Sequence, residues 1–104
     1  PLRSPLIVVL VASLQDDPKV PEIEQMLCTG AVANNMMLAS NALGFGSIWL
    51  TGDNTYDANV CRPLGLANSE RIIGFIYMGT PKVKMPNREI LNLSDKVMDW
   101  VKPL

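Results

Sequence analysis

The pattern of apolar and polar positions divides the chain into apolar runs separated by turn signals. Residues 6–12 (LIVVLVA) form a continuous aliphatic run, which is typical of a strand covered on both faces. Residues 47–51 (SIWLT) and 71–78 (RIIGFIYM) also have the composition of strands. Gly74 inside the last run indicates a bulge or a close approach of another group. The three runs predict a small sheet.

One long stretch of the chain carries no charged residue. From Gln25 to Gly52 there is no Asp, Glu, Lys or Arg, although charged residues make up 18% of the sequence. The first part of this stretch predicts a helix with Pro21 at its first position, two acidic residues in its first turn and an end near Leu43. Because so little of its surface is polar, we expect this helix to be central and buried.

One stripe of that helix is expected to face the core. Leu27, Ala31, Leu38 and Ala42 recur at helical spacing along it. Gly44 follows directly after the helix and is typical of a C-cap, because glycine adopts the left-handed conformation that ends many helices.

The remaining segments are shorter. Residues 56–62 predict a short helix, and residues 82–93 an irregular, mildly basic segment. Ser94 is a candidate cap for a last helix that runs through Trp100. The order is therefore β-α-β-α-β-loop-α, which predicts a single layered α/β or α+β domain.

Composition excludes two classes of partner. The net charge is −1 and the basic residues are scattered, so nothing attracts a phosphate backbone over a long range, and we expect no nucleic acid partner. The aliphatic run at residues 6–12 is far shorter than the ~20 residues that span a bilayer, and three asparagines interrupt the charge-free stretch, so we expect no membrane partner.

The two cysteines, Cys28 and Cys61, both fall inside predicted helices. We expect them to be reduced, buried thiols of a cytoplasmic protein. The chain has no histidine and no CxxC pair, so we expect no zinc site and no histidine general base.

A candidate ligand site lies at the end of the strand at residues 47–51. Trp49 and Thr51 come just before a Gly-Asp-Asn turn, and strand ends followed by glycine commonly hold ligands in α/β sheets; the alternative is plain core packing. Arg88, with Lys84 nearby, is a candidate phosphate contact or a solvated basic loop. The glycines at 44 and 46 follow a helix and precede a strand, which is the reverse of a dinucleotide-binding loop.

Six segments occur in a fixed order over about residues 5–82: Glu24-Gln25, Gly30-Ala31, 34–46 (NNMMLASNALGFG), 47–52 (SIWLTG), 64–66 (LGL) and 70–81 (ERIIGFIYMGTP). Their order and spacing resemble the C-terminal half of a nitroreductase-family flavin reductase, closest to the small, compact branch. The resemblance implies an α+β fold, a nitroreductase-like sandwich of which this chain supplies central strands and a long buried central helix. Residues 1–104 are then expected to be the C-terminal part of a single domain whose N-terminal half is absent, with Pro1 an internal position of a longer polypeptide.

The resemblance also implies a function. It implies an FMN-dependent oxidoreductase that passes electrons from NAD(P)H to nitroaromatic or quinone-type acceptors by a ping-pong mechanism. It implies a homodimer, or association with the missing N-terminal half. No catalytic side chain is expected, because the flavin does the redox chemistry. The alternative is a truncated, inactive flavin-fold module that serves as a binding protein.

Site residues are carried over by position. The residues implied to bind FMN are Trp49, Leu50, Thr51, Gly52 and Arg88. The residues implied to bind NAD(P)H are Ala39, Ser40, Asn41, Ala42, Leu43 and Gly44. The family's Arg-Arg-Ser type and Asn/Gln-Pro-Trp type motifs do not occur in this chain, so we expect it to hold only part of a flavin site and to bind FMN weakly.

Overall fold

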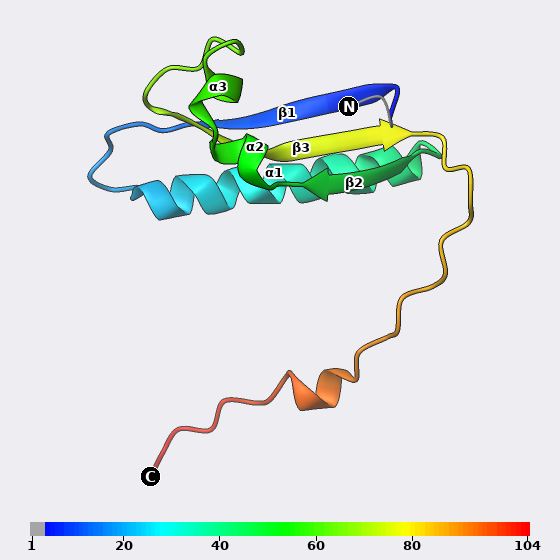
Figure 1. Cartoon of the computed structure of the whole chain (residues 1–104). Coiled ribbons are helices and arrows are strands. Elements are labelled where there is room, and N and C mark those ends of the chain that lie inside the picture. The colour runs from blue at the N-terminus through cyan, green and yellow to red at the C-terminus, as the bar shows by residue number, and fades with distance from the viewer. Residues whose placement is uncertain (1–3) are drawn as a thin grey trace.

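The computed structural model describes residues 4–104, so the prediction for Pro1 lies outside the described residues. The elements are β1 (Leu6–Ser13), α1 (Glu22–Ala42), β2 (Gly46–Leu50), α2 (Asp53–Tyr56), α3 (Ala58–Cys61), β3 (Glu70–Gly79) and the 3₁₀ turn η1 (Leu93–Asp95). The helix α1 lies along one face of the sheet (Figure 1). The three predicted strands and the long helix are confirmed, as is the α+β class.

The sheet has the order β1-β3-β2, and both pairs are antiparallel. The β1–β3 register shifts between Leu10 and Val11: Leu10 lies opposite Gly74, whereas Val11 lies opposite Ile72. Ile73 is therefore an extra residue on β3. This β-bulge confirms the prediction made from Gly74.

The side chain of Trp49 fills the space between β3 and α1. Its indole Nε1–H donates to the carbonyl oxygen of Ile73, the bulged residue, at 3.2 Å. A Cβ on Gly74 would collide with the indole, and a Cβ on Gly30 of α1 would lie 3.7 Å from Cη2 of the same ring. The absence of a side chain at Gly74 thus makes room for the ring, whereas Gly30 leaves space for a methyl group.

The end of α1 is a complete glycine cap. Gly44 has φ 86°, its N–H donates to the carbonyl of Asn41 at 2.9 Å, and the N–H of Phe45 donates to the carbonyl of Ser40 at 3.0 Å. This pair of bonds is the Schellman arrangement, and it confirms the predicted C-cap. It also turns the chain directly into β2.

The prediction that this stripe of α1 faces the core is wrong. Leu27 is 66% exposed and Leu38 is 62% exposed, whereas the buried residues of α1 are Ala33 and Ser40. The helix turns its small side chains toward the sheet because the indole of Trp49 occupies the space between them. The long helix is therefore central in position, but its outer side is exposed.

The prediction that the first strand is covered on both faces is also wrong. Ile72 and Ile76 of β3 point toward α1 and are buried. The other face of the sheet, which we call the open face, has no long helix on it. By the register, its side chains are Ile7, Val9, Ile48, Leu50, Phe75 and Tyr77. These residues are half-buried or exposed, so apolar composition alone did not indicate how many faces were covered.

Three local predictions need correction. The segment 56–62 is not one helix: Asp57 is extended and caps α3, its Oδ1 accepting from the N–H of Asn59 at 2.8 Å. The helix predicted from Ser94 to Trp100 is limited to η1, because a short helix with nothing packed against it gains too little to form. Pro21 is the residue before the first helical position of α1.

The burial predicted for the cysteines holds only in part. Cys28 lies in α1 and is exposed, which contradicts the prediction, whereas Cys61 lies in α3 and is half-buried. Among residues 4–104, no helix is both long and apolar enough to cross a membrane.

Residues 80–104, which we call the arm, run away from the sheet and helix (Figure 1). The radius of gyration is 17.9 Å, whereas a compact chain of this length has about 13 Å. The arm exposes large apolar side chains, among them Ile90, Met98, Trp100 and Val101. Its first residues, which follow the end of β3, form one wall of the groove described below.

The indole between two glycines yields a test of packing. Gly74→Ala should lower the free energy of unfolding by about 1–3 kcal/mol, because its Cβ would overlap the Trp49 ring. Gly30→Ala is the matched control: its Cβ meets the ring at an ordinary contact distance, and alanine should stabilise the helix by about 0.5–1 kcal/mol. Urea denaturation followed by circular dichroism measures both, and equal effects would contradict the packing.

Candidate functional site

A groove of about 1030 Å³ lies between the sheet and the first part of the arm. From β2 it is lined by Ile48 and Leu50 and from β3 by Tyr77, which belong to the open face. Met37 of α1 and Ser47 also line it, so it reaches round the free edge of β2. The arm supplies the remaining wall through Thr80, Pro81, Met85, Pro86, Asn87 and Arg88.

The groove combines an apolar floor with a single cation. Among the described residues that line it, Arg88 is the one that carries charge. A guanidinium presents several N–H donors in a fixed plane, which suits phosphate or carboxylate. Ile48, Leu50 and Tyr77 offer apolar side chains at the same time. The groove therefore suits a ligand that combines an apolar part with an anionic group.

The structure brings together two of the five residues implied to bind FMN. Leu50 and Arg88 both line the groove. Trp49 does not line it, because its ring lies between β3 and α1. Thr51 and Gly52 follow the end of β2, where Gly52 has φ 117° and its carbonyl accepts from the N–H of Thr55 at 2.9 Å.

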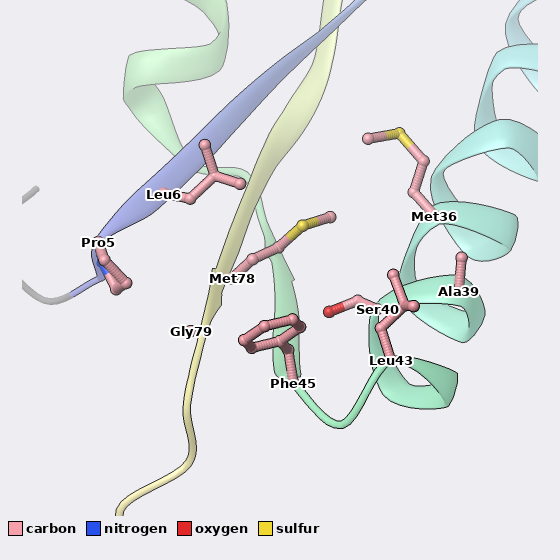
Figure 2. A pocket seen from close by; sticks show the side chains of 9 residues that line it. All are labelled: Pro5, Leu6, Met36, Ala39, Ser40, Leu43, Phe45, Met78 and Gly79. Carbon is pink, nitrogen blue, oxygen red and sulfur yellow. The ribbon is translucent and has the colours of Figure 1, made fainter.

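A second pocket, of about 420 Å³, lies between the last turns of α1 and the ends of β1 and β3 (Figure 2). Its walls are almost wholly apolar and consist of Pro5, Leu6, Met36, Ala39, Ser40, Leu43, Phe45, Met78 and Gly79. Ser40 is only 6% exposed, and its Oγ has no hydrogen-bond partner. In Figure 2 this oxygen points from the helix toward Phe45. The pocket thus offers one unsatisfied hydroxyl in an apolar setting.

Three of the six residues implied to bind NAD(P)H line this pocket. Ala39, Ser40 and Leu43 line it, whereas Asn41, Ala42 and Gly44 do not. None of the described residues on the pocket's walls is charged, so these residues offer no ionic partner for a pyrophosphate. They fit an uncharged ring or chain with one hydrogen-bonding atom.

The two cavities adjoin, because both are lined by Pro5, Met78 and Gly79. The pocket lies by the first residues of β2, whereas Thr51 and Gly52 follow its last. The two segments implied to bind cofactors therefore lie at opposite ends of the same strand.

Sequence reasoning missed several residues that line these cavities. Tyr77 and Ile48 were assigned to strands but not to a face, and Phe45 and Met78 were not singled out. Alternation along β3 does place Phe75 and Tyr77 on one face, so a period-two count was the available signal. No sequence pattern indicates that Asn87 lines the groove, because this depends on the course of the irregular arm.

No group of three or more His, Cys, Asp or Glu side chains among residues 4–104 is arranged to hold a metal ion.

Comparison with known proteins identifies close relatives. The model of the Nitroreductase family matches residues 1–80. The protein YdjA of Escherichia coli strain K12, provisionally named an NAD(P)H nitroreductase, is 39% identical over 84 residues, which cover 81% of this chain and 46% of YdjA. A Haemophilus influenzae protein with the same provisional name is 32% identical over 81 residues, covering 75% of this chain and 43% of the relative. The chain thus spans about half the length of these relatives.

Solved structures show the same fold. A nitroreductase-like protein from Bacillus cereus aligns with a TM-score of 0.73 at 21% identity, over 93% of this chain and 51% of its own. An oxidoreductase from Vibrio harveyi, described as NADPH:FMN oxidoreductase complexed with NAD⁺, aligns with a TM-score of 0.53 at 23% identity, over 70% of this chain and 38% of its own. The predicted nitroreductase-like α+β fold is confirmed.

Stability measurements test whether the Ser40 hydroxyl in the smaller pocket lacks a hydrogen-bond partner. Ser40→Ala should raise the free energy of unfolding by about 1 kcal/mol, because it removes a buried hydroxyl that has no partner. Thr29→Ala is the control, since the Thr29 hydroxyl on the same helix donates to the carbonyl of Gln25 at 3.0 Å. Thermal unfolding compares the two, and a loss of stability in Ser40→Ala would show that the hydroxyl has a partner in solution.

Proposed function

The chain is a member of the nitroreductase family, and from this membership we propose that it forms part of an FMN-dependent oxidoreductase that passes electrons from NAD(P)H to nitroaromatic or quinone-type acceptors. The names of its relatives support the nicotinamide donor. The Vibrio harveyi neighbour, named for NADPH and FMN, supports the pair of cofactors. Because the chain spans about half of each relative, the activity belongs to the whole assembly that this chain helps to form.

The observation that carries the proposal is the groove that both Leu50 and Arg88 line. Flavin mononucleotide has a flat tricyclic ring at one end and a phosphate at the other. The apolar floor of Ile48, Leu50 and Tyr77 suits the ring, and the Arg88 guanidinium suits the phosphate. The residues present fit the group.

When bound, FMN supplies the two-electron chemistry. The protein side chains bind and orient it: Arg88 neutralises the phosphate, and the open face provides a surface against which the ring packs. Backbone N–H groups near Gly52 are candidates to stabilise negative charge on the reduced ring, since preformed dipoles do this without reorganising. No side chain of the chain is assigned a proton-transfer role.

The donor has to meet the flavin in the groove. The smaller pocket lies on the helix side of the sheet, whereas the floor of the groove lies on the open face, and a hydride passes only between rings in contact. We therefore propose that the nicotinamide ring of NAD(P)H packs against the flavin ring from the open side of the groove. A ping-pong mechanism requires the donor to leave before the acceptor binds, and an open groove permits that exchange.

A second candidate is a flavin-fold module that binds without turnover. The observation that favours it is the single cation in the groove, which leaves most of the charge of an FMN phosphate to be neutralised by groups outside this chain. The exposed Cys28 thiol fits a reducing compartment, and we propose the cytoplasm for either candidate.

Flavin titration tests the site. The full chain should quench the fluorescence of added FMN saturably. Arg88→Ala should weaken the affinity for FMN by about tenfold, because it removes a charge-assisted contact to the phosphate. The affinity of the unmodified chain should also fall as the salt concentration rises.

Two controls sharpen the titration. Lys84→Ala removes a nearby cation that does not line the groove and should leave the affinity unchanged. Riboflavin, which lacks the phosphate, should bind the unmodified chain and Arg88→Ala equally. Equal losses in Arg88→Ala and Lys84→Ala would contradict the site, and the absence of saturable binding would contradict a flavin role for this chain. Binding without NADH or NADPH oxidation in the presence of a nitroaromatic would favour the module without turnover.

A further inference from the structure

The smaller pocket contains a hydroxyl group that the rest of the described chain leaves unpaired. Ser40 is only 6% exposed, and its Oγ has no hydrogen-bond partner. A hydroxyl inside a helix often donates to the carbonyl four residues earlier, and Thr29 on the same helix bonds to Gln25 in this way at 3.0 Å. Ser40 makes no such bond, and in Figure 2 its oxygen points away from the helix. This polar group is therefore free for a ligand.

Water is a poor partner for this hydroxyl. An ordered buried water typically makes about three hydrogen bonds to the protein. The walls of the pocket are almost wholly apolar, and among the described residues that line it Ser40 is the one with a hydroxyl, amide or charged side chain. A molecule that places one polar atom at Ser40 and apolar surface against the other walls satisfies both.

The walls favour an aromatic ring. Met36 and Met78 bring thioether sulfurs, which make favourable contacts with aromatic rings, and Phe45 brings a ring against which another can pack. The volume of about 420 Å³ is at the lower end of the range of about 300–1,000 Å³ for ligand pockets, which suits one or two fused rings. A charged ligand would lose its hydration here without gaining an ionic partner from the described walls.

We propose that this pocket binds a small, neutral aromatic compound with one hydroxyl or carbonyl oxygen, which forms a hydrogen bond with Ser40 Oγ. The ring of the compound packs among Met36, Leu43 and Phe45. Phe45 is 47% exposed, so its side chain has room to turn between rotamers and to open the way to the buried oxygen.

The site is separate from the groove and does not depend on flavin binding. The pocket lies on the helix side of the sheet, whereas the floor of the groove lies on the open face. A compound held beside Ser40 therefore does not contact a flavin in the groove. Its role differs from the nicotinamide role that the resemblance implies for Ala39, Ser40 and Leu43, because it is bound here without reacting.

Nuclear magnetic resonance of the full chain, with its methionine methyl groups labelled, is the first measurement. The probe is naphthol, which has two fused neutral rings and one hydroxyl. Saturating naphthol should shift the methyl signal of Met36, which lines the pocket, and leave that of Met37, which lines the groove, in place. Naphthoate, which carries a carboxylate instead, should not shift Met36. The absence of a saturable Met36 shift, or a Met37 shift of equal size, would overturn the proposal.

Ser40→Ala tests the hydrogen bond. The variant should bind naphthol about three- to tenfold more weakly, because the hydroxyl of the ligand loses its partner. Naphthalene has the same rings and no polar atom, so its affinity should be the same for the variant and the unmodified chain. Equal losses for the two compounds would contradict the bond to Ser40.

A larger side chain on the wall tests the location. Ala39 lines the pocket and is exposed, so Ala39→Phe should fill the space and abolish naphthol binding. Ala42→Phe is the matched control, because Ala42 is exposed near the end of the same helix but does not line the pocket. Circular dichroism checks that both variants are folded.

Two results would count against a small-molecule site. Binding of naphthol that persists in Ala39→Phe would place the compound elsewhere. A Met36 signal that depends on protein concentration and does not respond to naphthol would assign the pocket to a contact between copies of the chain. Either result would overturn the proposal.

Discussion

The packing of the Trp49 indole between the helix and the sheet is the tightest constraint on how α1 and β3 lie together. A ring of this size can lie there because Gly74 has no side chain. Its Nε1–H also satisfies the carbonyl of Ile73, which the bulge leaves out of the strand ladder. One side chain thus fills the space, supplies a donor to an irregular point of the sheet and determines which side of α1 faces inward.

The helix α1 covers one face of the sheet, and no long helix covers the other face. Apolar side chains therefore lie exposed on the open face and on the outer side of α1. The first surface becomes the floor of a groove with one cation, Arg88, and the second is a charge-free stripe.

The sequence predicted the elements well because each depends on local signals. Aliphatic runs marked the strands, acidic residues and Gly44 marked the ends of α1, and Gly74 marked the bulge. The family resemblance also predicted the fold; the FMN site that it implies stays a prediction, although Leu50 and Arg88 line one groove. The faces were not predictable, because the stripe at Leu27 and Leu38 has the composition of a core and only tertiary packing decides which side is buried. The course of the arm likewise depends on contacts that composition does not specify.

The strand order β1-β3-β2 has a consequence for how the chain folds. β2 and β3 are separated by two short helices, whereas β1 pairs with β3 across almost the whole length of the domain, from Leu6 opposite Met78 to Ser13 opposite Glu70. Contacts between residues far apart in sequence form slowly, because a long loop must close first. During synthesis β1 leaves the ribosome well before its partner strand exists. A continuous aliphatic segment then has no partner strand, which exposes the newly made chain to aggregation until β3 has been made.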